Sequence, residues 1–356
     1  MPTPYKRAKD FFKWIKGEAA RLSAYVPIVD SHVQSDTGES AVNVPFEADR
    51  HYFRAMISEM FLSESRRWFS EYNPLVYSAV EFSYGTRQEE EPKVVGPSLI
   101  GQNAPQETLY LNTPVCGLHP FRGGDITFTA ILYRGRLSDH VRDFVAMVER
   151  VVGAVNPSVA LAGYVGIANV IVEGLDMILG TKQTEPVIGL HTTFGTGNPF
   201  KPGYHALINS DASSVDSEKL WVRGGRLYVG DSLEESVPYQ KNDFVLFQFM
   251  QVNDRDDLSL LSFYPLWQEV QKQAVDPKKW DEAKNTFATM YRGLLLSDDL
   301  TEDQKERLRV SYTGRLTTMR KTARDQARLG GQTIPDKPSA MHDKLTELDD
   351  LFKDLD

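Results

Sequence analysis

The ten residues LWVRGGRLYV at positions 220–229 constrain the fold of this chain more than any other segment. Gly224 and Gly225 lie between two runs in which apolar and polar residues alternate. Glycine readily adopts the positive φ angles that a two-residue turn needs, and alternation places the apolar side chains of each strand on one face. The segment therefore predicts an antiparallel β-hairpin.

Further segments have the pattern of strands. Residues 50–61 and 75–84 alternate roughly and are rich in Val, Ile, Phe and Tyr, and residues 125–134 (DITFTAILYR) alternate cleanly. Residues 243–252 (DFVLFQFMQV) are nearly all apolar, as in a central strand that is covered on both faces. We therefore expect a largely antiparallel sheet or sandwich from residue 46 to about residue 252.

Helical patterns, with apolar residues three and four positions apart, occupy five internal segments: 138–155, 157–180, 263–274, 276–295 and 301–329. Asp276 and Pro277 are a strong helix start, and Thr301 with Gln304 occupies the capping-box positions of the last helix. The fold class is therefore α+β: a mostly antiparallel β-sheet or sandwich with packed helices, followed by a helical C-terminal section.

The length of 356 residues exceeds that of a usual single domain, so we expect several parts. We predict a basic amphipathic N-terminal helix (1–26), an α+β core domain (46–275), a helical C-terminal section (276–330), and a linker with an acidic docking tail (331–356). Residues 86–105 contain three consecutive Glu followed by several Pro and Gly, which predicts a long surface connection.

The two ends of the chain have opposite charge and suit contact with a partner. The first carries an apolar helical stripe flanked by six cations, and the last is acidic with its own apolar stripe. A short helix on a Gly- and Pro-containing linker suits docking into a groove, either on a partner or on this protein's own body. The predicted partner-binding residues are Phe11, Phe12, Ile15, Leu345, Leu348, Phe352 and Leu355.

The charge balance limits the class of partner. The chain has a net charge of −9 and a pI near 5.4, so its surface as a whole repels polyphosphate chains and nucleic-acid binding is not expected. One helix, 301–329, is nevertheless rich in cations. We assign it as a weak anion-contacting surface with four candidate residues: Arg309, Arg315, Arg320 and Arg324.

Two features indicate the compartment. Cys116 is the single cysteine, so no intrachain disulfide forms, which suits a reducing environment. The N-terminal residues lack the apolar run of a secretion signal. We expect a cytoplasmic protein whose N-terminal helix packs against the body or a partner, with membrane contact as the alternative for that helix alone.

The most apolar stretch, residues 151–180, is expected to be buried within the protein. It carries Glu173 and Asp176, which oppose insertion into a membrane. A membrane-acting effector, in which this stretch leaves the body and inserts, is therefore only a distant alternative.

Several polar residues are candidates for catalytic or metal-binding groups. Cys116 and His119, in PVCGLHPFRGG, act as nucleophile and base only if the fold turns them toward each other, and a buried thiol beside a loop histidine is the simpler interpretation. His191, His205 and Asp211 lack the close spacing of zinc sites. We therefore assign no catalytic residue, no metal and no cofactor.

Two further segments have simpler interpretations than a site. Arg255 is expected to neutralise the acidic residues around it, Asp254, Asp256 and Asp257. The loop FGTGNPFKPG lacks the GK[ST] ending of a phosphate cradle and is interpreted as a surface turn.

These observations favour a non-enzymatic interaction protein, an adaptor or assembly subunit that contacts a protein partner or itself through its terminal helices. The alternative is a hydrolase whose site is assembled from dispersed loops at 116–125, 191–205 and 254–257. A pocket in which these residues converge would favour the hydrolase.

Overall fold

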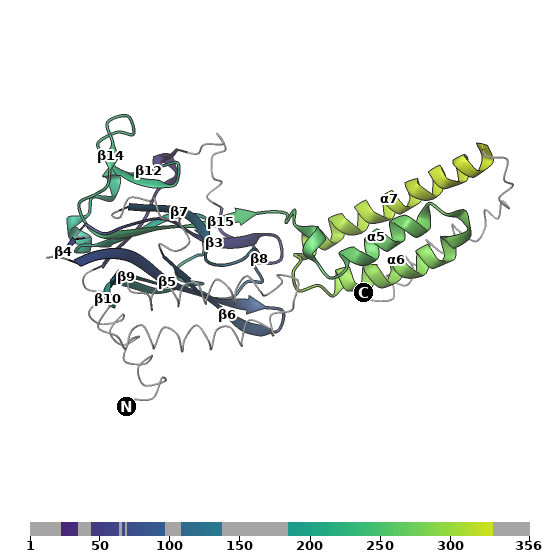
Figure 1. Ribbon diagram of the computed structural model, residues 1–356, viewed down its shortest axis with the longest axis horizontal. Helices are drawn as coiled ribbons and strands as arrows, with labels where there is room; N and C mark the ends of the chain where they lie inside the picture. The colour runs from purple at the N-terminus through teal and green to yellow at the C-terminus, as the bar shows by residue number, and fades with distance from the viewer. Residues whose placement is uncertain are drawn as a thin grey trace, which may run out of the picture. The chain divides into compact units, whose positions relative to one another are not determined.

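The computed structural model describes residues 23–34, 44–63, 66–67, 70–96, 108–136 and 184–329 (Figure 1). The chain divides into two compact units. Unit 1 comprises Met1–Leu260 with Asp298–Gln304, and unit 2 comprises Leu261–Ser297 with Lys305–Asp356. The described part of unit 1 is rich in strands and that of unit 2 is helical, so the α+β fold class is confirmed.

The first sheet of unit 1 is antiparallel throughout. Its strands in spatial order are β1 (Ser23–Pro27), β11 (Gly203–Asn209), β15 (Phe244–Val252), β3 (Tyr52–Phe61) and β7 (Thr108–Pro114), with the short β8 (His119–Pro120) also paired to β3. Strand β15 has strands on both sides and buried side chains on both faces: Val245 and Phe247 on one, Phe244 and Leu246 on the other. The prediction of a central strand at 243–252 is confirmed.

The second sheet is also antiparallel. Its order is β10 (Thr184–Phe194), β9 (Ile126–Arg136), β5 (Ser70–Tyr84) and β4 (Arg66–Arg67), and β6 (Arg87–Val95) pairs with β5. The predicted strands at 75–84 and 125–134 are therefore confirmed, whereas β10 was not predicted.

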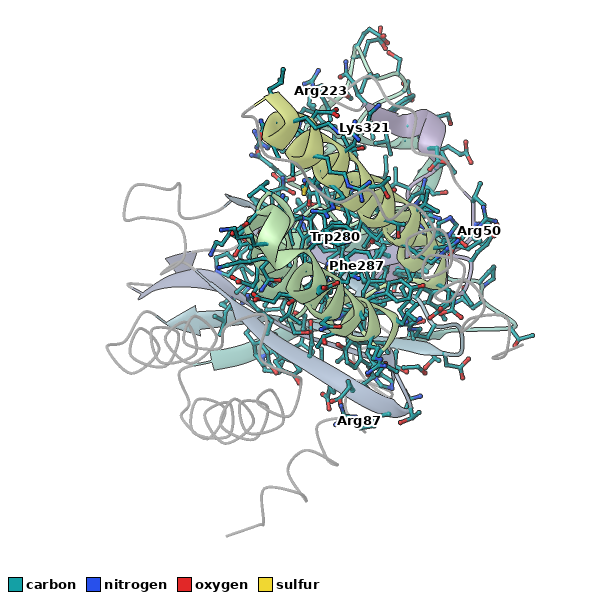
Figure 2. The ribbon with its side chains drawn as sticks, turned by 90° about the vertical axis from the view of Figure 1, so that its right-hand side faces the viewer. Arg50, Arg87, Arg223, Trp280, Phe287 and Lys321 are labelled. Carbon is teal, nitrogen blue, oxygen red and sulfur yellow. The ribbon has the colours of Figure 1, made fainter. Side chains whose placement is uncertain are left out.

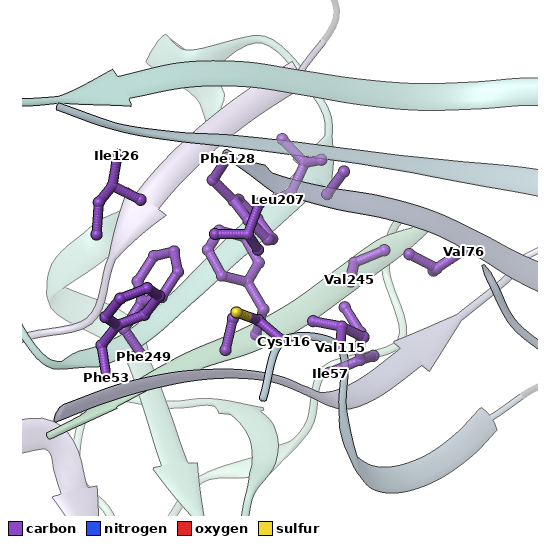
Figure 3. Packing of buried hydrophobic residues seen from close by; sticks show 14 of the residues in the cluster. Phe53, Ile57, Val76, Val115, Cys116, Ile126, Phe128, Leu207, Val245 and Phe249 are labelled. Atoms are coloured by element: carbon purple, nitrogen blue, oxygen red, sulfur yellow. The ribbon is translucent and has the colours of Figure 1, made fainter. Parts of the chain in front are cut away.

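The main core of unit 1 contains apolar side chains from both sheets (Figure 3). Strand β9 contributes the alternate residues Ile126, Phe128, Ala130 and Leu132, as expected for a strand with one face in the core. The first sheet contributes side chains from β3, β11 and β15, among them Phe53, Ile57, Leu207 and Phe249. Burial of each large apolar side chain stabilises the fold by about 1.5–3 kcal/mol.

A third, smaller sheet shares a second cluster with the opposite face of the first sheet. Its order is β14 (Val237–Pro238), β13 (Arg226–Val229), β12 (Leu220–Arg223) and β2 (Val33–Gln34), with β2 parallel to β12. Strands β12 and β13 form the predicted hairpin, and Gly224 and Gly225 have φ angles of 54° and 72°.

The prediction of a surface connection over residues 86–105 is wrong for its first half. Strand β6 pairs with β5 from Arg87 to Val95. The alternate residues Glu89 and Glu91 are buried, whereas Gln88 and Glu90 are exposed. Position in the sheet therefore overrides composition, because a strand at a sheet edge tolerates proline and charged residues.

Unit 2 contains α5 (Tyr264–Ala274), α6 (Trp280–Leu295) and most of α7 (Glu302–Leu329), and α5 lies beside α6 (Figure 1). The Asp276 carboxylate accepts a hydrogen bond from the Lys278 backbone N–H at 2.9 Å, which confirms the predicted helix start. The buried stripe comprises Trp267, Val270, Ala283, Phe287, Met290, Leu294, Tyr312 and Leu316.

Short 3₁₀ turns complete the described chain: η2 (Asp30–His32), η4 (Ala212–Ser214), η5 (Ser217–Lys219), η6 (Leu258–Leu260) and η7 (Pro277–Lys279). The predicted helices at 138–155 and 157–180, and the two terminal helices, lie outside the described residues. Among the helices that are described, none combines the length and the apolar character needed to cross a membrane.

Candidate functional site

Three reactive side chains meet inside unit 1. Glu91 of β6 pairs with the core residue Val80 of β5, so its side chain lies on the core face of the second sheet. Cys116 and His119 follow β7, and His119 pairs with Phe53 of the first sheet. The acid therefore comes from one sheet, and the thiol and imidazole come from the chain at the edge of the other.

The carboxylate of Glu91 is the centre of the group. Its Oε1 lies 2.7 Å from His119 Nε2, and its Oε2 accepts the backbone N–H of Gly117 at 2.9 Å. The Cys116 thiol also donates a hydrogen bond to it. The candidate ligand atoms of Glu91, Cys116 and His119 all lie within 4.8 Å of one another, and all three residues are buried.

Burial and hydrogen bonding have opposite effects on the pKa of the Glu91 carboxyl. Burial raises the pKa of the Glu91 carboxyl, but the charge of His119 and the hydrogen bonds from His119, Gly117 and Cys116 outweigh it, so the pKa falls to about 2. Burial, followed by the charge of Glu91, raises the pKa of the Cys116 thiol. The carboxylate is therefore ionised while the thiol keeps its proton.

Aromatic rings and a glycine fix the position of the imidazole. The ring of His119 lies 4.5 Å from that of Phe82 and 6.0 Å from those of Phe53 and Tyr84, measured between centroids. A Cβ atom at Gly117 would lie 3.1 Å from His119 Nε2, so the close approach favours glycine. His119 Nδ1 is buried and has no hydrogen-bond partner.

The structure thus brings together Cys116 and His119, as the nucleophile hypothesis required. A nucleophilic cysteine reacts as the thiolate, and here the thiol is protonated and buried, so the geometry does not favour thiol catalysis. Glu91 was missed because its segment was predicted to be a connection. The burial of Glu89, Glu91 and Val95 is visible only in the structure, so the sequence offered no signal that identifies this strand.

The other histidine and carboxylate candidates occupy separate environments. His191 Nδ1 lies 2.9 Å from Thr129 Oγ1, and His205 Nδ1 lies 2.7 Å from the hydroxyl of Tyr25. Asp211 is exposed and precedes η4. In the part of the chain that the structure describes, these three residues do not form a metal-ligating group.

Arg255 pairs with its acidic neighbour, as predicted. Its Nε and one terminal nitrogen lie 2.6 and 2.9 Å from the two carboxylate oxygens of Asp257. The same guanidinium donates to the backbone oxygen of Asp299 at 3.0 Å. The acidic residues at 254–257 therefore surround a buried arginine, while the predicted turn at 194–203 is closed by a bridge between Gly195 and Asn198.

The four predicted anion-contacting arginines lie on α7 in different environments. Arg309 pairs with Glu306 at 2.7 Å. The guanidinium of Arg315 lies 5.0 Å from the ring centroid of Trp267, and that of Arg320 lies 4.7 Å from the ring centroid of Trp280. Trp280 of α6 and Lys321 of α7 are labelled in Figure 2.

Arg320 is unusual because it is buried without sufficient hydrogen-bond acceptors. Only 6% of the residue is exposed, and neither its Nε nor its Nη1 has a partner. Arg324, one turn along, also has a buried Nε without a partner. Burial, and then the positive charge of Arg324, lowers the pKa of Arg320, against the opposite effect of Asp281.

The predicted partner-binding residues of the two ends, Phe11 to Ile15 and Leu345 to Leu355, lie outside the described residues. Comparison with known proteins found no matching family model, no matching curated protein and no matching solved structure. Function is therefore argued from the residues themselves.

Proposed function

We propose that this chain is a non-enzymatic interaction protein, an adaptor or assembly subunit of the cytoplasm. In this proposal it binds an acidic protein segment through a basic surface of unit 2, formed by Arg315, Arg320, Lys321 and Arg324. The acidic segment belongs to a partner or to a second copy of the chain. The observation that carries the proposal is that Arg320 is buried while two of its guanidinium nitrogens, Nε and Nη1, lack an acceptor.

An unpaired buried donor is costly, about 1–3 kcal/mol for each group and more for a charged one. A carboxylate that accepts from either nitrogen lowers this cost, and because Nε and Nη1 lie on different edges of the guanidinium, two acceptors are needed to satisfy both. Trp280 packs against the guanidinium of Arg320, and such stacking leaves the N–H groups at the edge available. Because both nitrogens are buried in the structure, the proposal requires the side chain of Arg320 to turn outward when a carboxylate binds.

The charge distribution supports the same partner. Residues 261–297 and 305–329 contain 13 Lys or Arg and six Asp or Glu, a formal charge of +7, whereas the whole chain carries −9. The same unit exposes four large apolar side chains: Val275, Leu296, Val310 and Leu329. A unit that exposes both cations and apolar side chains suits an acidic helix with an apolar stripe better than it suits a nucleic acid.

The chain itself contains a segment of this chemistry. Residues 341–356 (MHDKLTELDDLFKDLD) combine an apolar stripe with acidic residues, so the tail of one copy is a candidate ligand for unit 2 of another. The proposal therefore includes self-assembly, and the tail supplies a defined peptide for binding experiments.

The test compares the full chain with a chain that lacks residues 331–356, by light scattering and by titration of a labelled 341–356 peptide. We expect the deletion to abolish self-association and the shortened chain to bind the peptide. The double variant Arg320→Ala with Arg324→Ala should weaken binding of the peptide by about tenfold or more, which corresponds to about 1.4 kcal/mol of binding free energy.

The matched control is Arg87→Ala with Arg223→Ala, which removes two exposed cations of unit 1 (Figure 2). The control should change peptide affinity less than twofold. Equal weakening by the two double variants, or assembly that is unchanged by the deletion, contradicts the proposal. Tighter binding of an oligonucleotide than of the peptide would assign the surface to nucleic acid instead.

A further inference from the structure

We propose that Glu91, Cys116 and His119 bind one Zn²⁺ ion inside unit 1. The ion joins β6 of the second sheet to the chain that follows β7 at the first sheet. The three ligand atoms already lie within 4.8 Å of one another in buried positions. This inference is independent of the proposed interaction function, because it uses different residues.

The donor set selects the metal. Thiolate sulfur and imidazole nitrogen suit zinc and poorly suit Mg²⁺ or Ca²⁺, which prefer oxygen ligands. One carboxylate, one thiolate and one imidazole supply three of the four positions of tetrahedral zinc, and a solvent oxygen or small ligand takes the fourth.

Charge neutrality favours the ion in this buried position. Zn²⁺ with a thiolate, a carboxylate and a neutral imidazole has no net charge, so the complex has a low cost of burial compared with an isolated charge.

The two ring nitrogens of His119 differ in their hydrogen bonding. His119 is only 8% exposed, yet its Nδ1 has no hydrogen-bond partner, so the ring has a buried nitrogen that nothing in the protein satisfies. Gly117 keeps the space beside His119 Nε2 and Glu91 Oε1 free of a side chain. The nitrogen beside the carboxylate is Nε2, 2.7 Å from Glu91 Oε1, so Nε2 is the atom that binds the ion.

Zinc binding exchanges hydrogen bonds for coordinate bonds. The ion takes the place of the hydrogen that the Cys116 thiol donates to Glu91 and of the hydrogen between His119 Nε2 and Glu91 Oε1. The thiol proton leaves to solvent, and the imidazole keeps one hydrogen, on Nδ1, so that it stays neutral.

The test uses the full chain, with Zn²⁺ and then Co²⁺ as probes. We expect one equivalent of zinc per chain by elemental analysis after dialysis, and a rise in the melting temperature when zinc is added to metal-free protein. Cobalt should give a thiolate-to-metal charge-transfer band. Because Cys116 is the single cysteine, this band reports on one thiolate.

The isosteric variants Cys116→Ser, Glu91→Gln and His119→Gln test each ligand. Each should lower the affinity for zinc by at least about 100-fold, since even the loss of a residue that only hydrogen-bonds to a metal ligand lowers metal affinity by about 10–100-fold. His191→Gln and Asp256→Asn are the controls and should retain one equivalent.

Two results would overturn the proposal. The first is wild-type protein that binds no stoichiometric zinc and shows no change in melting temperature with the metal. The second is cobalt bound without a charge-transfer band, which places the ion away from Cys116. If a variant fails to fold, these wild-type measurements decide the question.

Discussion

Units 1 and 2 each bury a charged side chain, but the two side chains have different surroundings. Glu91 of unit 1 accepts hydrogen bonds from His119, Gly117 and Cys116. Arg320 of unit 2 lies against Trp280 and has two N–H groups without an acceptor. The carboxylate is thus satisfied within the protein, whereas the guanidinium needs an acceptor from outside. Glu91 therefore contributes to the fold of unit 1, and Arg320 is the residue that we propose to bind a ligand.

The largest expected effect is that of Glu91→Gln in metal-free protein. The amide removes the charge that holds His119 and places an N–H₂ donor among existing donors. Breaking a buried charged network costs about 3–5 kcal/mol, so urea should unfold unit 1 at a markedly lower concentration. The control Glu90→Gln changes an exposed residue of the same strand that faces Glu81, and should leave the midpoint unchanged or slightly raised.

The titration of His205 tests burial in unit 1, because it makes the stability of the protein depend on pH. Burial lowers the pKa of His205 from 6.5 to about 4. In the unfolded chain the imidazole takes up a proton near pH 6.5, so between pH 6.5 and 4 the unfolded state binds more protons than the folded state. Stability should therefore fall by about 3 kcal/mol as the pH is lowered through this window, and His205 should have no such effect above it.

The variant His205→Asn isolates that contribution. Asparagine retains an acceptor for the hydroxyl of Tyr25 but does not ionise. Urea unfolding at a series of pH values should show a smaller slope for the variant than for the wild type between pH 6.5 and 4. Identical slopes would show that His205 is not held neutral by burial.

A smaller effect is expected from Gly117→Ala, which crowds the centre of the Glu91 group. The new methyl would lie 3.1 Å from His119 Nε2 and 3.8 Å from Glu91 Oε1, and overpacking costs about 1–3 kcal/mol. Gly197→Ala is the matched control, because a Cβ there meets no atom within 4 Å. Equal thermal stability of the two variants would mean that the packing around His119 is loose.

The smallest effect on stability is expected from Arg320→Met. Replacement of a buried, poorly paired charge by an apolar side chain is commonly neutral or stabilising, so the free energy of unfolding should stay within about 1 kcal/mol of the wild type or rise. The same variant should weaken binding of the acidic 341–356 peptide. A loss of several kcal/mol in urea unfolding would instead make Arg320 a structural residue and remove the contrast with Glu91.

Much of the fold could be predicted from local pattern. The strands at 50–61, 125–134 and 243–252 and the Gly224-Gly225 hairpin were predictable because one- or two-sided burial leaves a clear period in the sequence. Strand β6 was not, because its acidic residues contradict the composition of a strand and only its pairing with β5 buries Glu91.

The candidate sites show the same limit. Cys116 and His119 could be singled out as neighbours in sequence, but their acidic partner is 25 residues before Cys116 and comes from another strand. The cationic face of α7 was visible in the sequence. The pairing of Arg309 with Glu306 is local to α7, whereas the contact of Arg320 with Trp280 of α6 joins two helices and no helical period reveals it.

The central claim, that unit 2 binds acidic side chains through Arg320 and Arg324, is tested most directly by a double-mutant cycle. The cycle combines Arg320→Ala with Arg324→Ala in the chain lacking 331–356, and Asp349→Asn with Asp350→Asn in the 341–356 peptide. The account predicts a coupling free energy of at least about 1 kcal/mol, because contacting charges are not additive. Additive losses would show that these arginines and carboxylates do not meet, and would contradict the account.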